Sequence, residues 1–338
     1  MSADVNQETP QERDRSDKAP ERLFIGVDVG GTKILGVAVE PTTGQVRGSK
    51  RVPTPRGDPG SVGPTIAGVV DELIEAHGPP AAVGVGVPGL VDHEGVLHYG
   101  PNVPGVFDLD IAGDLRRALN LPVVADNDAA NAALAEHRIG AARGAMHAVI
   151  ITQGTGIGGA LIIGGKLLRG ANGFAGEPGH MLIDQAGHLC ACGRRGCWET
   201  VSSGAGLANL SRDLIEEGRG QRILELAGGE PAHIRGEHVS AAMAEGDDDA
   251  EEVLEKFSTW VARGIGSLIT LLDPELVVLG GGLAVINQHF LSDVRSKVPA
   301  AVLGGQYRPT VPIVAASLGE EAGAIGAAIN ARDLFLAH

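Results

Sequence analysis

All three cysteines of the chain fall within one short glycine-rich segment, and a histidine precedes them. The residues are His180, Cys190, Cys192 and Cys197, in the spacing H-x9-C-x-C-x4-C. Three thiolates and one imidazole form a closed tetrahedral ligand set for Zn²⁺, with no open position at which water could react. The spacing therefore predicts a structural zinc site. The alternative is three reduced cysteines beside an unrelated histidine.

A glycine turn follows the first apolar run and has the residue types of a phosphate site. It contains Asp28, Gly30, Gly31, Thr32 and Lys33. Glycines let the backbone approach a ligand closely, and exposed N–H groups and a threonine hydroxyl can donate to phosphate oxygens. Asp28, at the end of the strand, could orient a magnesium ion through water. The alternative is an ordinary hairpin turn whose aspartate bonds only within it.

A second glycine turn lies more than a hundred residues later and also follows an apolar run. It includes Gly154, Thr155, Gly156 and Gly158, which form part of a formal GxGxxG motif with Glu177 downstream. A dinucleotide-binding motif must open a helix, but the run that follows, ALIIGGKLLRG, is rich in β-formers. We therefore reject a nicotinamide site and interpret the two turns as related halves that face one ligand.

A third glycine cluster ends the apolar strand ELVVL. At Gly281 and Gly282, the absence of side chains would let adenine or ribose lie against the backbone. A strand-to-helix turn without a ligand explains the pattern equally well.

An acidic residue stands between the strand LPVV and an alanine-rich helix. Asp128 would lie at the carboxyl end of the strand, on the rim where α/β clefts form. From position alone, capping of the helix by Asn127 or Asp128 is the commoner role.

The elements around these residues alternate between strands and helices. Strands are expected at PAAVGVGVP, LPVVADN and PELVVLGGG, and helices at IAGDLRRALN, DAANAALAEHRIGAA, AEEVLEKFSTWVARGIGSLITLL and EEAGAIGAAINARDLFLA. This alternation predicts an α/β fold in which helices cover the sheets. With 338 residues, of which 43% are hydrophobic, the chain can build about two domains.

The charge and the start of the chain limit the partners. A formal net charge of −15 disfavours nucleic acid and acidic lipid, which require a basic surface. No apolar run is long enough to cross a membrane. The first 22 residues are polar and lack the features of a secretion signal, so we expect a disordered tail and a cytoplasmic protein.

Several motifs together resemble the ROK family of bacterial sugar kinases and sugar-responsive repressors. The resemblance runs from Leu23 to the C-terminus, and among family members it is to glucokinases of the actinobacterial type. The motifs are DVGGTK at 28–33, GVGVPGLVD at 84–92, the Asn of YGPN at 102, ADNDAAN at 125–131, TQGTGIGGA at 152–160, GFAGEPGHM at 173–181 and CACGRRGCWE at 190–199.

The resemblance implies an actin-like, two-domain kinase fold with duplicated ribonuclease-H-like cores and a cleft for ATP and Mg²⁺. The implied domains are a small one over 23–130 and 319–338 and a large one over 131–318, which carries the zinc segment 180–197. Asp128 becomes the catalytic base, and the implied sugar contacts are Asn102, Asn127, Asp128, Glu177, His180 and Glu199. A histidine bound to zinc cannot also act as a free base. The resemblance also implies a homo-oligomer, either a dimer or a tetramer.

The expected reaction is transfer of a phosphoryl group from ATP to glucose. Other hexoses, namely N-acetylmannosamine, N-acetylglucosamine or fructose, remain alternatives, as does polyphosphate as the donor. A repressor would need a helix-turn-helix module, and the 22 polar residues before the first strand are too few to form one. A catalytically silent sugar sensor would share the fold.

Overall fold

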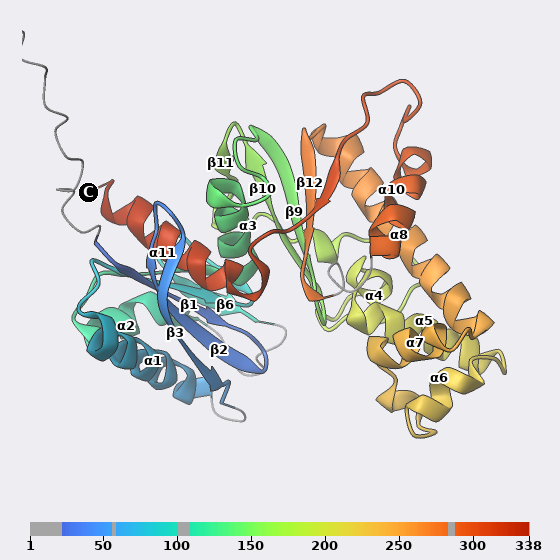
Figure 1. The fold of residues 1–338 in the computed structure, drawn as a ribbon, viewed down its shortest axis with the longest axis horizontal. Coiled ribbons are helices and arrows are strands. Elements are labelled where there is room, and N and C mark those ends of the chain that lie inside the picture. Colours follow the sequence, from blue (N-terminus) through green and yellow to red (C-terminus); the bar gives the residue numbers. More distant parts are fainter. Residues whose placement is uncertain (1–21, 56–58, 101–107, 283–287, 338) are drawn as a thin grey trace, which may run out of the picture.

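The computed structural model describes residues 22–55, 59–100, 108–282 and 288–337. The predicted tail lies outside these residues except for its last one, and Asn102 lies outside them as well. Two five-stranded sheets form the centres of two halves, which are joined side by side (Figure 1).

The first sheet has the strand order β3-β2-β1-β4-β8, in which β1, β2 and β3 form an antiparallel meander and β4 and β8 continue parallel to β1. Its strands are β1 (Phe24–Val29), β2 (Lys33–Glu40), β3 (Gln45–Pro53), β4 (Val83–Val87) and β8 (Val123–Asn127). Helices α1 (Val62–His77) and α2 (Ile111–Leu119) bury their apolar residues against one face of this sheet.

The second sheet repeats this plan in the order β11-β10-β9-β12-β13. Its strands are β9 (His147–Gln153), β10 (Ile157–Ile163), β11 (Lys166–Leu167), β12 (Leu276–Gly280) and β13 (Ile313–Ala315). Again the first three strands are antiparallel and the last two run parallel to the first. Helices α8 (Asp248–Leu272) and α10 (Gln288–Ala301) pack on one face. The shared order confirms the duplication that the two glycine turns indicated.

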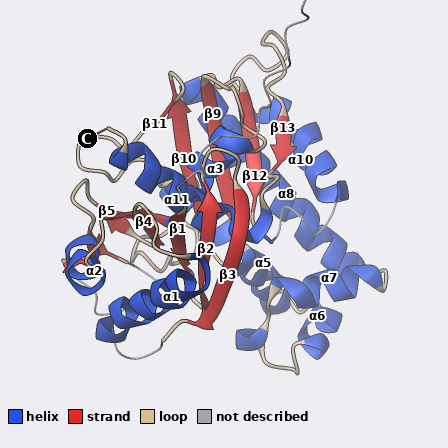
Figure 2. Ribbon diagram, turned by 60° about the vertical axis from the view of Figure 1, so that its left-hand side comes forward, coloured by secondary structure: helices blue, strands red, loops and turns tan. Residues whose placement is uncertain are grey.

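Two further helices, α3 and α11, cross between the halves. Helix α3 (Asp128–Ile139) follows the first sheet but packs on β9 and β10, whereas α11 (Ala322–Phe335) follows the second sheet but packs on β1 and β4. The two helices also contact each other between the sheets (Figures 1 and 2). A Cβ atom on Gly84 would lie 1.8 Å from the carbonyl oxygen of Ala327, so only glycine allows α11 to lie this close to β4.

Two insertions complete the fold. A small sheet of β5 (Leu90–Val91), β6 (Val96–Tyr99) and β7 (Leu109–Asp110) extends the first half. A longer insertion between β11 and α8 contains η2 (Pro178–His180), α4 (Glu199–Ser202), α5 (Gly204–Glu216), α6 (Gln221–Leu226), η3 (Pro231–His233) and α7 (Gly236–Ala244). The chain returns to α11 through η4 (Gly319–Glu321). None of the helices that the structure describes is both long and apolar enough to span a membrane.

Candidate active site

A cavity of about 190 Å³ lies where the carboxyl ends of β1, β9 and β12 meet the start of α11. Asp28, Asp128 and Gly281, all singled out from the sequence, line its wall, and the exposed Gly282 comes next in the chain. The cavity is also lined by Gly319, Glu320 and Gly323, which sequence reasoning missed. Gly319 and Gly323, before and within the last helix, were the sequence signal that could have indicated a close approach of backbone and ligand there.

Two of the acidic residues that line this cavity, Asp28 and Asp128, are partly buried. Burial, together with the nearby negative charge of Asp128, raises the pKa of Asp28 to about 7, although Lys33 partly opposes the shift. Burial also raises the pKa of Asp128, although N–H groups at the start of α3 oppose the shift. Two buried carboxylates of the same sign leave uncompensated negative charge, which a divalent cation would neutralise.

The junction of β8 and α3 gives its two polar residues different roles. Asn127 is the N-cap of α3, because its Oδ1 accepts a hydrogen bond from the N–H of Ala130 at 2.9 Å. Its Nδ2 donates to the carbonyl oxygen of Gly89 at 3.1 Å. Asp128 Oδ1 accepts from the N–H of Ala129 at 2.8 Å, and its side chain lines the cavity. Capping is therefore done by Asn127, and Asp128 faces the cavity.

The first glycine turn joins β1 to β2 and exposes Gly31 and Thr32 at its tip. The N–H of Gly30 donates to the carbonyl oxygen of Lys33 at 2.9 Å, so this predicted phosphate donor is used within the turn. The Lys33 ammonium lies 2.6 Å from Glu320 Oε2, at the edge of the cavity. Apart from Asp28, the residues of this turn are not part of the lining of the cavity.

The second glycine turn leads into strand β10, which confirms the β-rich continuation and agrees with rejecting a dinucleotide motif. Gly154 and Thr155 are exposed, and their carbonyl oxygens accept hydrogen bonds from the start of α5, from Gly204 at 2.8 Å and Ala205 at 3.2 Å. The N–H of Ile157, which follows Gly156, donates to Glu199 Oε2 at 2.8 Å. Gly158 lies within β10. This turn also lies outside the lining of the cavity.

The acidic residues on either side of the cysteine segment, Glu177 and Glu199, lie near each other, and Glu177 also lies near Asp128. Burial and the charges of Asp128 and Glu199 raise the pKa of Glu177 to about 7. Glu199 begins α4, and its Oε1 lies 3.5 Å from the thiol of Cys190. The structure thus brings Glu177 close to Asp128 at the start of α3, and Glu199 close to Glu177.

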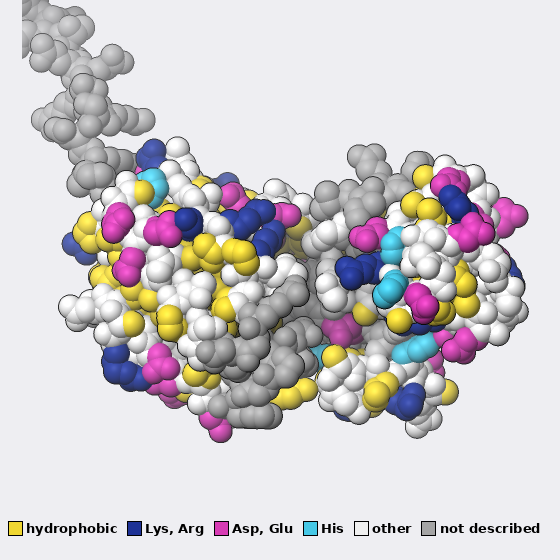
Figure 3. All heavy atoms as spheres, turned by 90° about the horizontal axis from the view of Figure 1, so that it is seen from below, with side chains coloured by type: hydrophobic (Ala, Val, Ile, Leu, Met, Phe, Trp, Pro, Cys, Tyr) yellow, Lys and Arg dark blue, Asp and Glu magenta, His cyan; other side chains and the backbone are white. Residues whose placement is uncertain are grey.

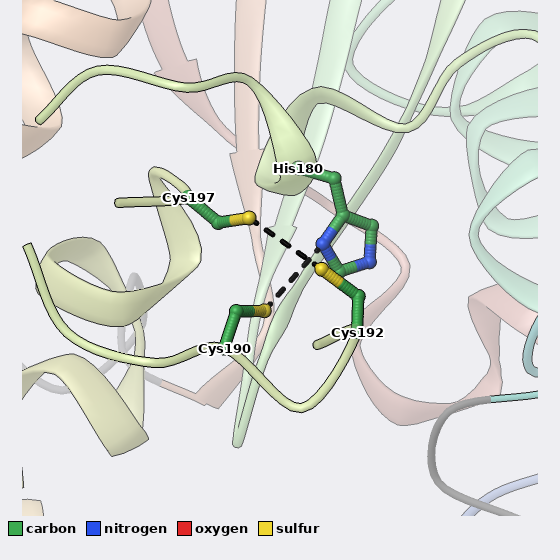
Figure 4. A group of neighbouring side chains, drawn as sticks. All are labelled: His180, Cys190, Cys192 and Cys197. Atoms are coloured by element: carbon green, nitrogen blue, oxygen red, sulfur yellow. Dashed lines mark hydrogen bonds between the residues drawn. The ribbon is translucent and has the colours of Figure 1, made fainter. Parts of the chain in front are cut away.

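The four predicted zinc ligands converge on one point (Figure 4). The sulfur of Cys190 lies 3.7 Å from His180 Nδ1, and the sulfurs of Cys192 and Cys197 are 3.6 Å apart. All four ligand atoms lie within 4.8 Å of one another. Zn–S bonds of about 2.3 Å in a tetrahedron require sulfurs to be roughly 3.8 Å apart. The side chains therefore fit a closed four-ligand zinc site.

Comparisons with known proteins agree over nearly the whole chain. The model of the ROK family matches residues 24–333. The chain is 35% identical over 313 residues to a glucokinase from Streptomyces coelicolor, covering 92% of this chain and 98% of the relative. It is 32% identical over 312 residues to an N-acetylmannosamine kinase from Escherichia fergusonii, covering 91% of this chain and 98% of the relative.

A solved structure gives the same result for the fold. The crystal structure of a ROK family glucokinase from Streptomyces griseus, in complex with glucose and AMPPNP, superposes with a TM-score of 0.81 at 35% sequence identity. The match covers 92% of this chain and 99% of that one.

Proposed function

This chain belongs to the ROK family, and on that premise we propose that it is a glucokinase, which transfers a phosphoryl group from ATP to glucose. Its duplicated sheets form the actin-like, ribonuclease-H-like kinase fold that the sequence resemblance implied. The observation that carries the proposal is the convergence of Asp128 and Glu177 beside a cavity that is lined by Asp28 and Gly281.

In this mechanism, Asp128 accepts the proton of the attacking sugar hydroxyl. Because the hydroxyl loses its proton late in a loose phosphoryl-transfer transition state, a carboxylate is a sufficient base. The backbone at Gly281 and Gly323 forms the wall against which the nucleotide lies. Mg²⁺, when bound, would neutralise phosphate charge, and Asp28 is the residue that would orient it.

The sugar contacts are carboxylates and amides, which can accept hydrogen bonds from hydroxyls. We assign this role to Asn127, Glu177 and Glu199 and, by family resemblance, to His180 and Asn102. Zn²⁺ held by the cysteine cluster would fix the segment that carries both glutamates, because Cys190 contacts Glu199 directly. Zinc would thus act on sugar binding and take no part in the chemistry.

Three further features complete the proposal, namely the domain boundaries, the oligomeric state and the location in the cell. We place the domain boundaries at 23–130 with 319–338 and at 131–318, supported by the packing of α11 on the first sheet. A homo-oligomer is supported by exposed apolar side chains at Leu271, Leu303 and Tyr307. A cytoplasmic location is supported by the need for ATP and for reduced thiols.

The surface agrees with a small-molecule substrate. On the face seen in Figure 3, Lys and Arg side chains are interspersed with acidic and apolar ones and form no continuous basic surface. A nucleic-acid partner would need such a surface.

The test is ATP consumption with Mg²⁺ across glucose, mannose, fructose, N-acetylglucosamine and N-acetylmannosamine, with polyphosphate as a parallel donor. Strong preference for glucose with ATP is expected. The second candidate is an N-acetylmannosamine kinase, which the 32% identical relative favours, and activity on that sugar would replace glucose as the substrate. Sugar binding without turnover would instead indicate a sensor.

A further inference from the structure

The segment that leads to Glu177 is docked on the other half of the molecule. It follows β11 of the second sheet, yet its residues contact the β5–β6 hairpin of the first half. His93 Nε2 lies 3.2 Å from the carbonyl oxygens of both Gly170 and Ala171. The ring of Phe174 meets the ring of His98 edge-on, with centroids 5.7 Å apart.

Gly173 shows how close this docking is. Its φ is +94°, and a Cβ atom at this position would lie 2.6 Å from the carbonyl oxygen of Val91. A side chain is therefore excluded by both the backbone conformation and the neighbouring strand.

Arg169 anchors the start of this segment in a buried polar network. Its Nε donates to Asp126 Oδ2 at 2.9 Å, and its terminal nitrogen donates to Asn330 Oδ1 at 3.0 Å. The amide of Asn330 also donates to Asp126 Oδ2 and to Asn131 Oδ1, each at 3.3 Å. Asp126, Asn131 and Asn330 are 6%, 0% and 4% exposed. The network joins β8, α3 and α11 to the segment.

The partners of Arg169 are the elements that hold the base. Asp126 lies in β8, two residues before Asp128, and Asn131 lies in the first turn of α3, which Asp128 begins. Glu177 follows Arg169 by eight residues, and beyond it the chain is fixed again at His180 in the cysteine cluster. Glu177 is thus held between two anchors.

We propose that Arg169 is a positioning residue that fixes Glu177 relative to Asp128, so that the sugar is held where its hydroxyl meets the base. The inference rests on the proposed function. Ordering the backbone costs conformational entropy, so a glycine-rich segment needs fixed ends to hold a side chain in place. The two hydrogen bonds to Asp126 and Asn330 come from different nitrogens of one planar guanidinium. Lysine has a single nitrogen and cannot reproduce this geometry.

The test compares Arg169→Gln with Arg138→Gln. Arg138 is a matched control because it also pairs with an aspartate, Asp333 of α11 at 2.8 Å, but it lies on α3 and its partner is not part of the segment that leads to Glu177. In Arg169→Gln the KM for glucose should rise about tenfold or more, because a misplaced Glu177 weakens the contact to the sugar. The KM for ATP should stay within about twofold, because Glu177 does not contact the nucleotide. Arg138→Gln should change neither constant.

If Arg169 only stabilised the fold, its replacement would not change the KM for glucose selectively. The proposal is overturned if Arg169→Gln leaves the glucose KM unchanged, or if the KM values for glucose and ATP rise together. If Arg169→Gln does not fold, Arg169→Lys replaces it as the test. This variant keeps the positive charge but loses the two-pronged guanidinium, and it should raise the KM for glucose, though less, without raising the KM for ATP. Parallel changes in Arg169→Lys would overturn the proposal too. A wild-type protein without sugar-dependent turnover would refute the proposed function itself.

Discussion

Asp28 and Asp128 face each other across Gly86. A Cβ atom on that glycine would lie 3.4 Å from Asp28 Oδ1 and 3.3 Å from the Cα atom of Asp128. Gly86 lies on β4, between β1 and β8, and is paired with Asp28 on one side and Asp126 on the other. The central strand thus keeps the space between the two carboxylates open.

Gly86→Ala should lower turnover while the protein remains folded. The added methyl would lie 3.1 Å from Asn131 Nδ2 and 3.3 Å from the Cα atom of Asp128, which is tighter than most real contacts, so Asn131 or the backbone at Asp128 must shift by a few tenths of an ångström. Gly68→Ala is the control, because a Cβ there meets nothing and alanine favours a helix by about 1 kcal/mol. Steady-state kinetics and thermal unfolding measure both variants. Full turnover by Gly86→Ala would show that this spacing is not needed.

Activity and stability should respond to pH in opposite directions. Catalysis requires ionised Asp128, whose pKa is raised by burial, so kcat/KM should rise with pH above the usual aspartate range and then level off. Asp28 has a folded pKa of about 7 and an unfolded value near 3.8, so the folded protein binds more protons in that window. Stability therefore falls as pH rises from about 4 to 7, and the loss persists above it.

Urea unfolding at pH 5 and pH 8 tests the stability half of this prediction. Asp28→Asn should raise the unfolding free energy at pH 8 by a few kcal/mol, about 2–4, and less at pH 5. Asp71→Asn removes an exposed carboxylate from α1 and serves as the control. An equal effect of Asp28→Asn at both pH values would argue against a raised pKa.

The cysteine cluster should hold one zinc ion for each chain. Cys192→Ser removes one ligand and should lower zinc content and melting temperature, because the irregular segment around it is held by the metal. His188→Gln changes a histidine of the same segment that pairs with Asp213 outside the cluster, and it should retain zinc. Elemental analysis and thermal unfolding with and without a chelator provide the measurements. A wild-type protein that lacks zinc and is indifferent to chelation would remove the structural role.

The histidine–cysteine cluster and the paired sheets could be predicted because their signals are local in sequence. His180 and the cysteines lie within one short segment, and each glycine turn connects two consecutive strands. The packing of α3 and α11 on each other's sheets was implied only by the family resemblance, which assigns 319–338 to the first half and 131–318 to the second. The residues alone do not indicate it, because it depends on contacts between residues about 200 positions apart, such as Asn131 and Asn330. Arg169 and Glu320 were missed as well, because their partners are distant in sequence. A charged residue that forms such a pair looks the same in sequence as one that is only solvated.

The central claim is tested most directly by phosphorus-31 NMR of the products that wild-type protein and Asp128→Asn form from ATP, Mg²⁺ and glucose. The account predicts ADP and glucose 6-phosphate from the wild type. Asp128→Asn should still bind glucose in calorimetry but form product about 10² to 10⁴ times more slowly, because it lacks the base. Zinc-loaded wild-type protein that forms no sugar phosphate, or Asp128→Asn that forms it at a near-normal rate, would contradict the account.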